Sequence, residues 1–352
     1  MYYCPACKKK FKKYLRRCPV CGGHCYRSDN RAILLIVAVG VLFLLLIGLI
    51  ILLGGTADTP QDGSASSSSL SSSVPVSSTP GSSSTPSSSG TPTSSVPPSS
   101  GSSENSLYTR DELEAMDTSY NEGGFGAGRA PNHARPSTPV TEQGKYAQYD
   151  AHFIGEDNKT VYLTFDCGYE YYATDANGQK YSVTGKILDV LKEKNIKGVF
   201  FITMGYAEAE PALIRRMIDE GHVVGNHSNN HPVMPSLSIE EMEYEVMSLH
   251  EYVLENFGYK MFLFRPPTGA YSAQSLAVLQ NLGYKSVFWS FQHFDYDPNN
   301  QPSLDTAYNT ITSNAHNGAI YLLHAVSEAN ANALADVIDY LHSEGYTIDL
   351  FS

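Results

Sequence analysis

Apolar positions follow two alternating patterns from residue 158 to the C-terminus. Short runs of β-branched and aromatic residues, such as 161–165, alternate with longer stretches in which apolar residues recur at spacings of three and four, as at Ile187, Leu188 and Leu191. The first pattern predicts strands, and the second predicts amphipathic helices packed on a sheet. The predicted strands are residues 161–165, 198–202, 222–225, 261–265, 285–289, 319–323 and 346–350, and the predicted helices are residues 182–194, 210–220, 238–257, 272–281, 305–315 and 329–343.

The regular alternation of strand and helix predicts the fold class. Parallel strands need a crossover connection, which is usually a helix, so this order of elements favours an α/β fold with parallel pairing. With seven predicted strands, we expect a distorted, closed or nearly closed (β/α) barrel. Ser238 and Glu241 fit a capping box at the start of the third helix. In such a barrel, side chains that follow successive strands meet on one face.

Side chains suited to metal binding or proton transfer follow five of the predicted strands. Each has a plain structural explanation by itself, such as a turn aspartate, a polar loop histidine or an ion-paired arginine. Their shared position at the carboxyl ends of strands favours a single active site instead. They are Asp166 after the first strand, His227 and His231 after the third, Arg265 at the end of the fourth, Asp295 after the fifth and His324 after the sixth.

The spacing of His227 and His231 suggests a metal site. On a helical turn, residues four apart share one face, close enough to bind one divalent ion. A bound zinc ion lowers the pKa of water from about 15.7 to about 7, which supplies a nucleophile for amide hydrolysis at neutral pH. Asp166 is the candidate base, and Arg265 is its charge partner.

A general acid is also needed for the departing amine. His324 suits this role because the ordinary pKa of histidine is near 6.5, and Asp295 is the candidate that orients its imidazole. A glycoside hydrolase is a rival interpretation, but it requires two carboxylates flanking the scissile bond. The predicted site offers histidines and an arginine as well.

Five ordered motifs carry a resemblance to a known family. TVYLTFDCGYE at 160–170, HSNNH at 227–231, RPPTG at 265–269, WSFQHFDY at 289–296 and YLLH at 321–324 resemble the motifs of NodB-type polysaccharide deacetylases, carbohydrate esterase family 4. The segments GKILDVLKEK, FRPPTGAYS and IYLLHAVSEANANALADVIDYLHSEGY are most similar to the PdaA-type peptidoglycan N-acetylmuramic acid deacetylases. The resemblance implies a barrel fold, a divalent metal, expected to be zinc, and an oxyanion site at the backbone N–H of Thr268.

Four positions depart from the family pattern, and one of them is Gln292, which stands where many relatives have Asp. Cys167 stands where the family has a second, metal-binding aspartate and where PdaA-type proteins have asparagine. A thiolate at Cys167 would favour zinc, whereas a small buried residue there would leave Asp166 or water to complete the metal site. Thr268 and Tyr296 replace the usual Tyr and Trp, so the wall of the sugar pocket is expected to differ.

The N-terminal segment contains two cysteine pairs. Cys4 with Cys7 and Cys18 with Cys21 have the spacing of a structural zinc site, and His24 and Cys25 follow them. A disulfide framework is the alternative, but it requires an oxidising compartment. We expect a zinc ribbon at residues 1–31.

An uncharged stretch at residues 32–53 follows the cysteine pairs. Its 22 residues would span about 33 Å as a helix, enough to cross a bilayer. A cleaved signal peptide is the alternative. Residues 1–53 hold nine Lys or Arg and one Asp, which gives them a formal charge of +8. Because the whole chain carries −12, residues 54–352 carry −20. This asymmetry predicts a cytoplasmic N-terminus and an external remainder, and the acidic majority argues against nucleic acid as a partner.

The remaining segments complete the expected organisation. Residues 54–106 are nearly all Ser, Thr, Pro and Gly and predict a disordered tether, and residues 107–157 predict a short helix followed by an irregular arm. The catalytic domain is expected at 158–352. We expect a single-pass membrane protein that removes acetyl groups from cell-wall polysaccharide, with N-acetylmuramic acid of peptidoglycan as substrate. The alternatives are an N-acetylglucosamine deacetylase and a non-catalytic wall-binding or sensing ectodomain.

Overall fold

The computed structural model describes residues 107–352 in full and the backbone of residues 2–4, 9–11 and 26–27. The chain divides into two compact units, residues 1–94 and 95–352. Among the described residues, no helix is long and apolar enough to cross a membrane. The span predicted at 32–53 and the tether predicted at 54–106 lie outside the described residues and stay predictions.

A small antiparallel sheet is described in the N-terminal unit. Strand β1 (Tyr2–Cys4) pairs with β2 (Lys9–Phe11) on one edge and with β3 (Tyr26–Arg27) on the other. The structure describes no side chain of this unit, so the predicted zinc ligands lie outside what is described. The zinc ribbon therefore stays a prediction.

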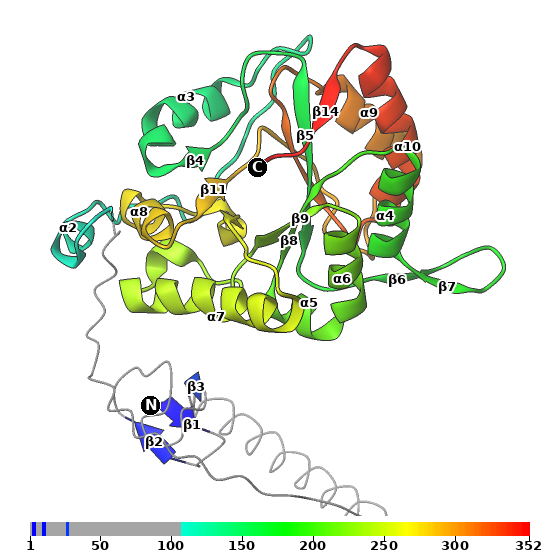
Figure 1. Cartoon of the computed structure of the whole chain (residues 1–352). Helices are drawn as coiled ribbons and strands as arrows, with labels where there is room; N and C mark the ends of the chain where they lie inside the picture. Colours follow the sequence, from blue (N-terminus) through cyan, green and yellow to red (C-terminus); the bar gives the residue numbers. More distant parts are fainter. Residues whose placement is uncertain (1, 5–8, 12–25, 28–106) are drawn as a thin grey trace, which may run out of the picture. The chain divides into compact units, whose positions relative to one another are not determined.

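The second unit is built on a curled parallel sheet of nine strands (Figure 1). All seven predicted strands belong to it, and two short strands, β4 and β12, were not predicted. The strand order is β12-β13-β5-β8-β9-β10-β11-β4, and β14 pairs with β5. The strands are β4 (Ala151–His152), β5 (Thr160–Cys167), β8 (Val199–Ile202), β9 (Val223–Asn226), β10 (Leu263–Phe264), β11 (Lys285–Val287), β12 (Phe291–Gln292), β13 (Ile320–His324) and β14 (Thr347–Asp349).

The curl of the sheet follows from the short link between β11 and β12. The sequence predicts one strand over 285–289, but β11 ends at Val287 and β12 begins at Phe291. β11 pairs with β10, whereas β12 pairs with β13 at the other end of the strand order. Because only three residues separate them, the two ends of the sheet approach each other. The fold is thus a curled half-barrel of the predicted (β/α) type.

Helices cover the outer face of the sheet (Figure 1). The predicted capping box at the start of α7 is confirmed, because Ser238 accepts from the N–H of Glu241 and the Glu241 side chain accepts from the N–H of Ser238. The helices that follow the strands are α4 (Val183–Glu193), α5 (Met204–Ala209), α6 (Pro211–Asp219), α7 (Ile239–Phe257), α8 (Ala273–Asn281), α9 (Leu304–Ser313) and α10 (Glu328–Ser343).

Alternation along β5 separates the outer core from the site. Leu163, Phe165 and Cys167 pack in the large apolar cluster that includes α4 and α10. Thr164 and Asp166 point to the opposite face, where both bond to a buried arginine. Because successive side chains of a strand point to opposite faces, one strand supplies both the core and the catalytic face.

The arm predicted at 107–157 packs closely on the catalytic domain. It contains α2 (Arg110–Glu114), α3 (Ser137–Tyr146), the 3-10 turn η1 (Ala147–Tyr149) and β4, and β4 pairs in parallel with β11. Phe125 and Phe153 from the arm join Phe288 and Trp289 in an aromatic cluster. The rings of Phe153 and Phe288 are stacked, with their centroids 4.1 Å apart. The arm therefore packs against the side of the sheet formed by β11 and the residues that follow it.

Candidate active site

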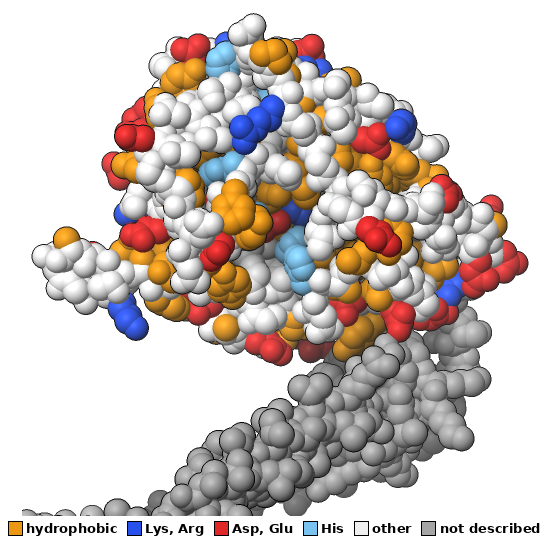
Figure 2. Space-filling model, turned by 180° about the vertical axis from the view of Figure 1, so that it is seen from behind, with side chains coloured by type: hydrophobic (Ala, Val, Ile, Leu, Met, Phe, Trp, Pro, Cys, Tyr) orange, Lys and Arg blue, Asp and Glu red, His pale blue; other side chains and the backbone are white. Residues whose placement is uncertain are grey.

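The predicted site residues meet in one pocket of about 600 Å³. Figure 2 shows a hollow on this face of the molecule, with histidine side chains in it. Asp166, His227, His231, Thr268 and His324 all line the pocket. Arg265 and Asp295 are fully buried behind it. The shared position at strand ends thus brings the candidates together, as expected for a barrel.

Asp166 and Arg265 form a buried ion pair. Arg265 Nη1 donates to Asp166 Oδ1 at 2.8 Å, and its other donors bond to Thr164 Oγ1 and to the carbonyls of Val287 and Phe288. Burial alone would raise the pKa of Asp166, but the positive charge and hydrogen bond of Arg265, together with the neighbouring His227 and His324, outweigh it and leave this pKa below its usual range. Asp166 is therefore an ionised carboxylate at neutral pH.

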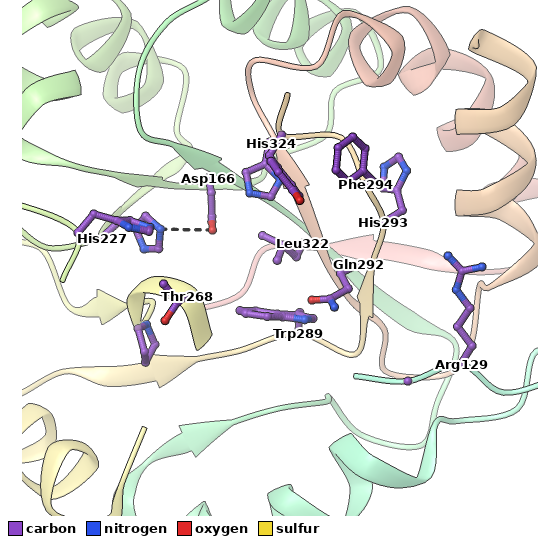
Figure 3. Close-up of a pocket in the computed structure, with 14 residues that line it drawn as sticks. Arg129, Asp166, His227, Thr268, Trp289, Gln292, His293, Phe294, Leu322 and His324 are labelled. Carbon is purple, nitrogen blue, oxygen red and sulfur yellow. Dashed lines mark ion pairs between the residues drawn. The ribbon is translucent and has the colours of Figure 1, made fainter. Parts of the chain in front are cut away.

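His227 presents one ring nitrogen to this carboxylate. Its Nδ1–H donates to the carbonyl of Arg265 at 2.9 Å, and its Nε2 lies 3.5 Å from Asp166 Oδ2 (Figure 3). Burial lowers the pKa of His227 to about 4, so the imidazole is neutral near pH 7. Nε2 then carries a lone pair that faces a carboxylate oxygen.

His231 lies beside His227, but not on a helical turn as its spacing predicted. β9 ends at Asn226, and the two histidines sit on the loop that follows. Ser228 and His231 have φ of 70° and 55°, and the N–H of His231 donates to Ser228 Oγ. This left-handed loop brings the imidazole centroids to 4.8 Å. The helical prediction was wrong, although the rings meet.

The two imidazoles and Asp166 Oδ2 suit a divalent cation. A neutral Nε2 lone pair and a carboxylate oxygen repel each other unless a cation lies beside them, and imidazole favours zinc-like metals. Within the described part of the chain, no cluster of three or more His, Cys, Asp or Glu side chains already has metal-binding geometry. The three side chains are therefore candidate ligands by their chemistry and their proximity.

His324 and Asp295 form a second pair across the pocket. His324 Nδ1–H donates to Asp295 Oδ1 at 2.7 Å, and its backbone N–H donates to Oδ2 at 2.9 Å. Asn330 also donates to Oδ2. Burial alone would lower the pKa of His324, but the negative charge and hydrogen bond of Asp295, together with the charge of Asp166, outweigh it and raise this pKa. The imidazole is thus held with its protonated form favoured, and its Nε2 has no hydrogen-bond partner among the described residues.

Thr268 lies on a strained turn at the edge of the pocket. The 3-10 turn η3 (Pro267–Gly269) holds it at φ 60°, a conformation uncommon for a residue with a side chain. The arm fixes this turn, because the N–H of Phe125 donates to the carbonyl of Gly269 at 2.9 Å.

Of the two alternatives for Cys167, the structure favours packing. The side chain is fully buried in the outer apolar cluster and does not line the pocket. Burial, and then the charges of Glu170 and Asp166, raise the pKa of the Cys167 thiol well above its usual range. Successive side chains of a strand point to opposite faces, so Cys167 faces away from Asp166 and the pocket.

Several pocket residues were given no role from the sequence, although Gln292 was noted as a departure from the family pattern. Gln292 lines it from β12 and Leu322 from β13, Trp289 and His293 line it from the residues on either side of β12, and Arg129 reaches it from the arm (Figure 3). The irregular GGFGAGRAP segment that carries Arg129 has no period from which its position could be predicted.

Comparison with known proteins agrees with this geometry. Residues 154–287 match the profile of the family described as polysaccharide deacetylase. The chain is 41% identical over 225 residues to the peptidoglycan N-acetylmuramic acid deacetylase PdaA of Bacillus subtilis, covering 63% of this chain and 82% of that protein. A peptidoglycan N-acetylglucosamine deacetylase of Bacillus cereus is 28% identical over 67% of this chain and 80% of its own length.

The solved structure of Bacillus subtilis PdaA, a family 4 carbohydrate esterase, has the same fold. It matches with a TM-score of 0.60 and 39% identity, covering 67% of this chain and 96% of that one. A family 4 carbohydrate esterase from Bacillus anthracis matches with a TM-score of 0.52 and 33% identity, covering 67% of this chain and 96% of that one. The chain therefore belongs to the polysaccharide deacetylase family, carbohydrate esterase family 4.

Proposed function

We propose that this protein is a metal-dependent hydrolase that removes the acetyl group from N-acetylmuramic acid in peptidoglycan. One observation carries the proposal: an ionised carboxylate, Asp166, and an imidazole with a raised pKa, His324, line the same pocket beside paired neutral imidazoles. Their environments thus favour an ionised base at Asp166 and a protonated acid at His324, the two groups that amide hydrolysis requires.

The two ion pairs divide the proton transfers. Asp166, kept ionised by Arg265, takes a proton from the attacking water, and His324, kept protonated by Asp295, gives a proton to the departing amine. The amide and one water thereby become acetate and a free amine. The backbone N–H of Thr268 is proposed to donate to the oxyanion that forms on the carbonyl.

His227, His231 and Asp166 Oδ2 are the residues that would hold the cation, which when bound acts as a Lewis acid on the amide carbonyl. Imidazole ligands favour zinc over magnesium or calcium. Chelation should abolish acetate release, and zinc should restore it. Zinc content of the chelated and restored samples gives a readout besides activity.

The pocket argues against the rival reaction. Asp166 is the only carboxylate among the described residues that line it, because Asp295 is buried behind His324. A glycoside hydrolase would need a second carboxylate on the other side of the scissile bond. The intact acid and base pairs likewise favour catalysis over a purely wall-binding domain.

The substrate can be tested directly. Peptidoglycan strands with and without stem peptides, and chito-oligosaccharides, are offered to residues 107–352, with acetate quantified and the freed amine located by mass spectrometry. We expect deacetylation of muramic acid, most readily on peptide-free residues, where the amine can close onto the lactyl carboxylate as a lactam. Acetate released only from glucosamine would support the second candidate, which the similarity to the Bacillus cereus enzyme favours.

We further propose that residues 32–53 anchor the protein with the catalytic unit outside the cell. Nine Lys or Arg before residue 54 and an acidic remainder support this orientation. The proposed cytoplasmic segment would hold structural zinc through Cys4, Cys7, Cys18 and Cys21. Protease added to intact cells should remove the catalytic unit and leave the N-terminal fragment protected. Protection of the catalytic unit instead would overturn the orientation.

A further inference from the structure

Arg129 is a cation of the pocket that the proposed reaction does not use. Among the described pocket-lining residues it is the only Lys or Arg, its side chain is exposed, and it forms no ion pair within the described part of the chain. Arg265 cannot serve the substrate, because it is fully buried and bonded to Asp166, Thr164 and two carbonyls. Arg129 is therefore the guanidinium of the described pocket lining that is open to an anion on the substrate.

The backbone around Arg129 is fixed on both sides. Before it, the N–H of Phe125 donates to the carbonyl of Gly269, and the ring of Phe125 packs on that of Trp289 with the centroids 5.6 Å apart. Ala127 is fully buried. After it, His133 Nδ1–H donates to the carbonyl of Ala315 at 2.7 Å. The arm thus fixes at the pocket the backbone that carries this side chain, which reduces the entropy lost when a ligand binds.

The surroundings of Arg129 suit a polar, acidic group. Figure 3 shows Arg129 and His227 on opposite sides of the pocket, with Asp166 and His324 between them in this view. Gln292 and His293 line the pocket on the Arg129 side, and neither is acidic. Trp289 also lines the pocket, and its buried Nε1–H donates to no described residue.

We propose that Arg129 binds the lactyl carboxylate of N-acetylmuramic acid and thereby selects this sugar over N-acetylglucosamine. This inference rests on the proposed function. The two sugars differ by the lactyl ether on the ring carbon next to the one that bears the acetamido group, so a carboxylate accompanies the amide into the pocket. Guanidinium pairs with carboxylate through two parallel hydrogen bonds. A stem peptide converts that carboxylate into a neutral amide, so peptide-free residues are the preferred substrate.

The test compares three substrates and three variants. Peptide-free glycan strands are assayed with the lactyl carboxylate free and as its methyl ester, beside chito-oligosaccharides. For Arg129→Ala, we expect kcat/KM on the free acid to fall about tenfold, equivalent to about 1.4 kcal/mol, chiefly through KM. The ester should be hydrolysed as by wild type, and Arg129→Lys should retain part of the preference. Arg110→Ala removes an arm arginine outside the pocket, whose partners are Glu114 and Glu240, and should match wild type.

The outcomes separate this inference from the proposed function. Equal losses on the acid and the ester, or an unchanged preference in Arg129→Ala, would overturn the role of Arg129 while muramic acid remains the substrate. No acetate from any muramyl strand with the wild-type protein would overturn the proposed function and this inference with it. A preference for the free acid that weakens with added salt in wild type and is absent from Arg129→Ala would support the ion pair.

Discussion

Replacing Gly124 by alanine should impair catalysis without touching a catalytic side chain. Gly124 has φ +71°, and a Cβ there would lie 1.9 Å from the carbonyl oxygen of Thr268 and 3.0 Å from its carbon. The next residue, Phe125, donates its N–H to Gly269 on the same turn. The arm and the turn that carries the proposed oxyanion donor are therefore in direct backbone contact.

The size of the effect follows from these distances. A carbon and a carbonyl oxygen normally approach no closer than about 3.3 Å, so the 1.9 Å contact must open by about 1.4 Å. A side chain at positive φ costs a further ~1–2 kcal/mol. Misplacing a catalytic group by about 1 Å can cost about 10²-fold in rate. We therefore expect kcat to fall about 10- to 100-fold and the free energy of unfolding to fall by about 1–3 kcal/mol.

Gly126→Ala is the matched control. It lies two residues along the same arm, its φ is not positive, and no atom lies within 4 Å of its added Cβ. Acetate release gives kcat for both variants, and urea unfolding gives their stability. A Gly124→Ala protein with wild-type kcat, or a Gly126→Ala protein equally impaired, would refute the argument that arm contact positions the turn.

Three further predictions concern the site itself. Asp166→Asn is assayed at saturating zinc, because Asp166 Oδ2 is one of the three proposed ligands and the variant should bind metal more weakly. With the metal site filled, kcat should still fall at least about 10²-fold, and ordinary activity would exclude Asp166 as the base. His227→Ala should lose metal and activity together, and metal content and acetate release distinguish the two variants. Asp295→Asn removes the charge that raises the pKa of His324. Since the protonated imidazole is the acid, the pKa of His324 should fall and the alkaline limb of the pH–activity profile should shift to lower pH. An alkaline limb that does not shift would contradict this role of Asp295. Cys167→Ser should leave zinc affinity unchanged but destabilise the fold by about 1–3 kcal/mol, because a hydroxyl replaces a thiol in an apolar cluster; a large loss of zinc affinity would make Cys167 a ligand.

The sequence alone determined the main elements and the place of the chemistry. Strand and helix periodicities depend on neighbouring residues, so the seven predicted strands and the cap at Ser238 could be found locally. The position of Asp166 and His324 at strand ends was sufficient to place both in one pocket, because parallel strands present their carboxyl ends on one face.

Only the tertiary structure decided how the site residues are held. The left-handed loop at His231, the break between β11 and β12 and the saturation of Arg265 by four acceptors depend on contacts between distant segments. The position of Arg129 depends on an arm without periodicity, fixed by one backbone bond to Gly269 and by aromatic packing. Such contacts are absent from local patterns, because they form only when segments far apart in the sequence pack together in the folded domain.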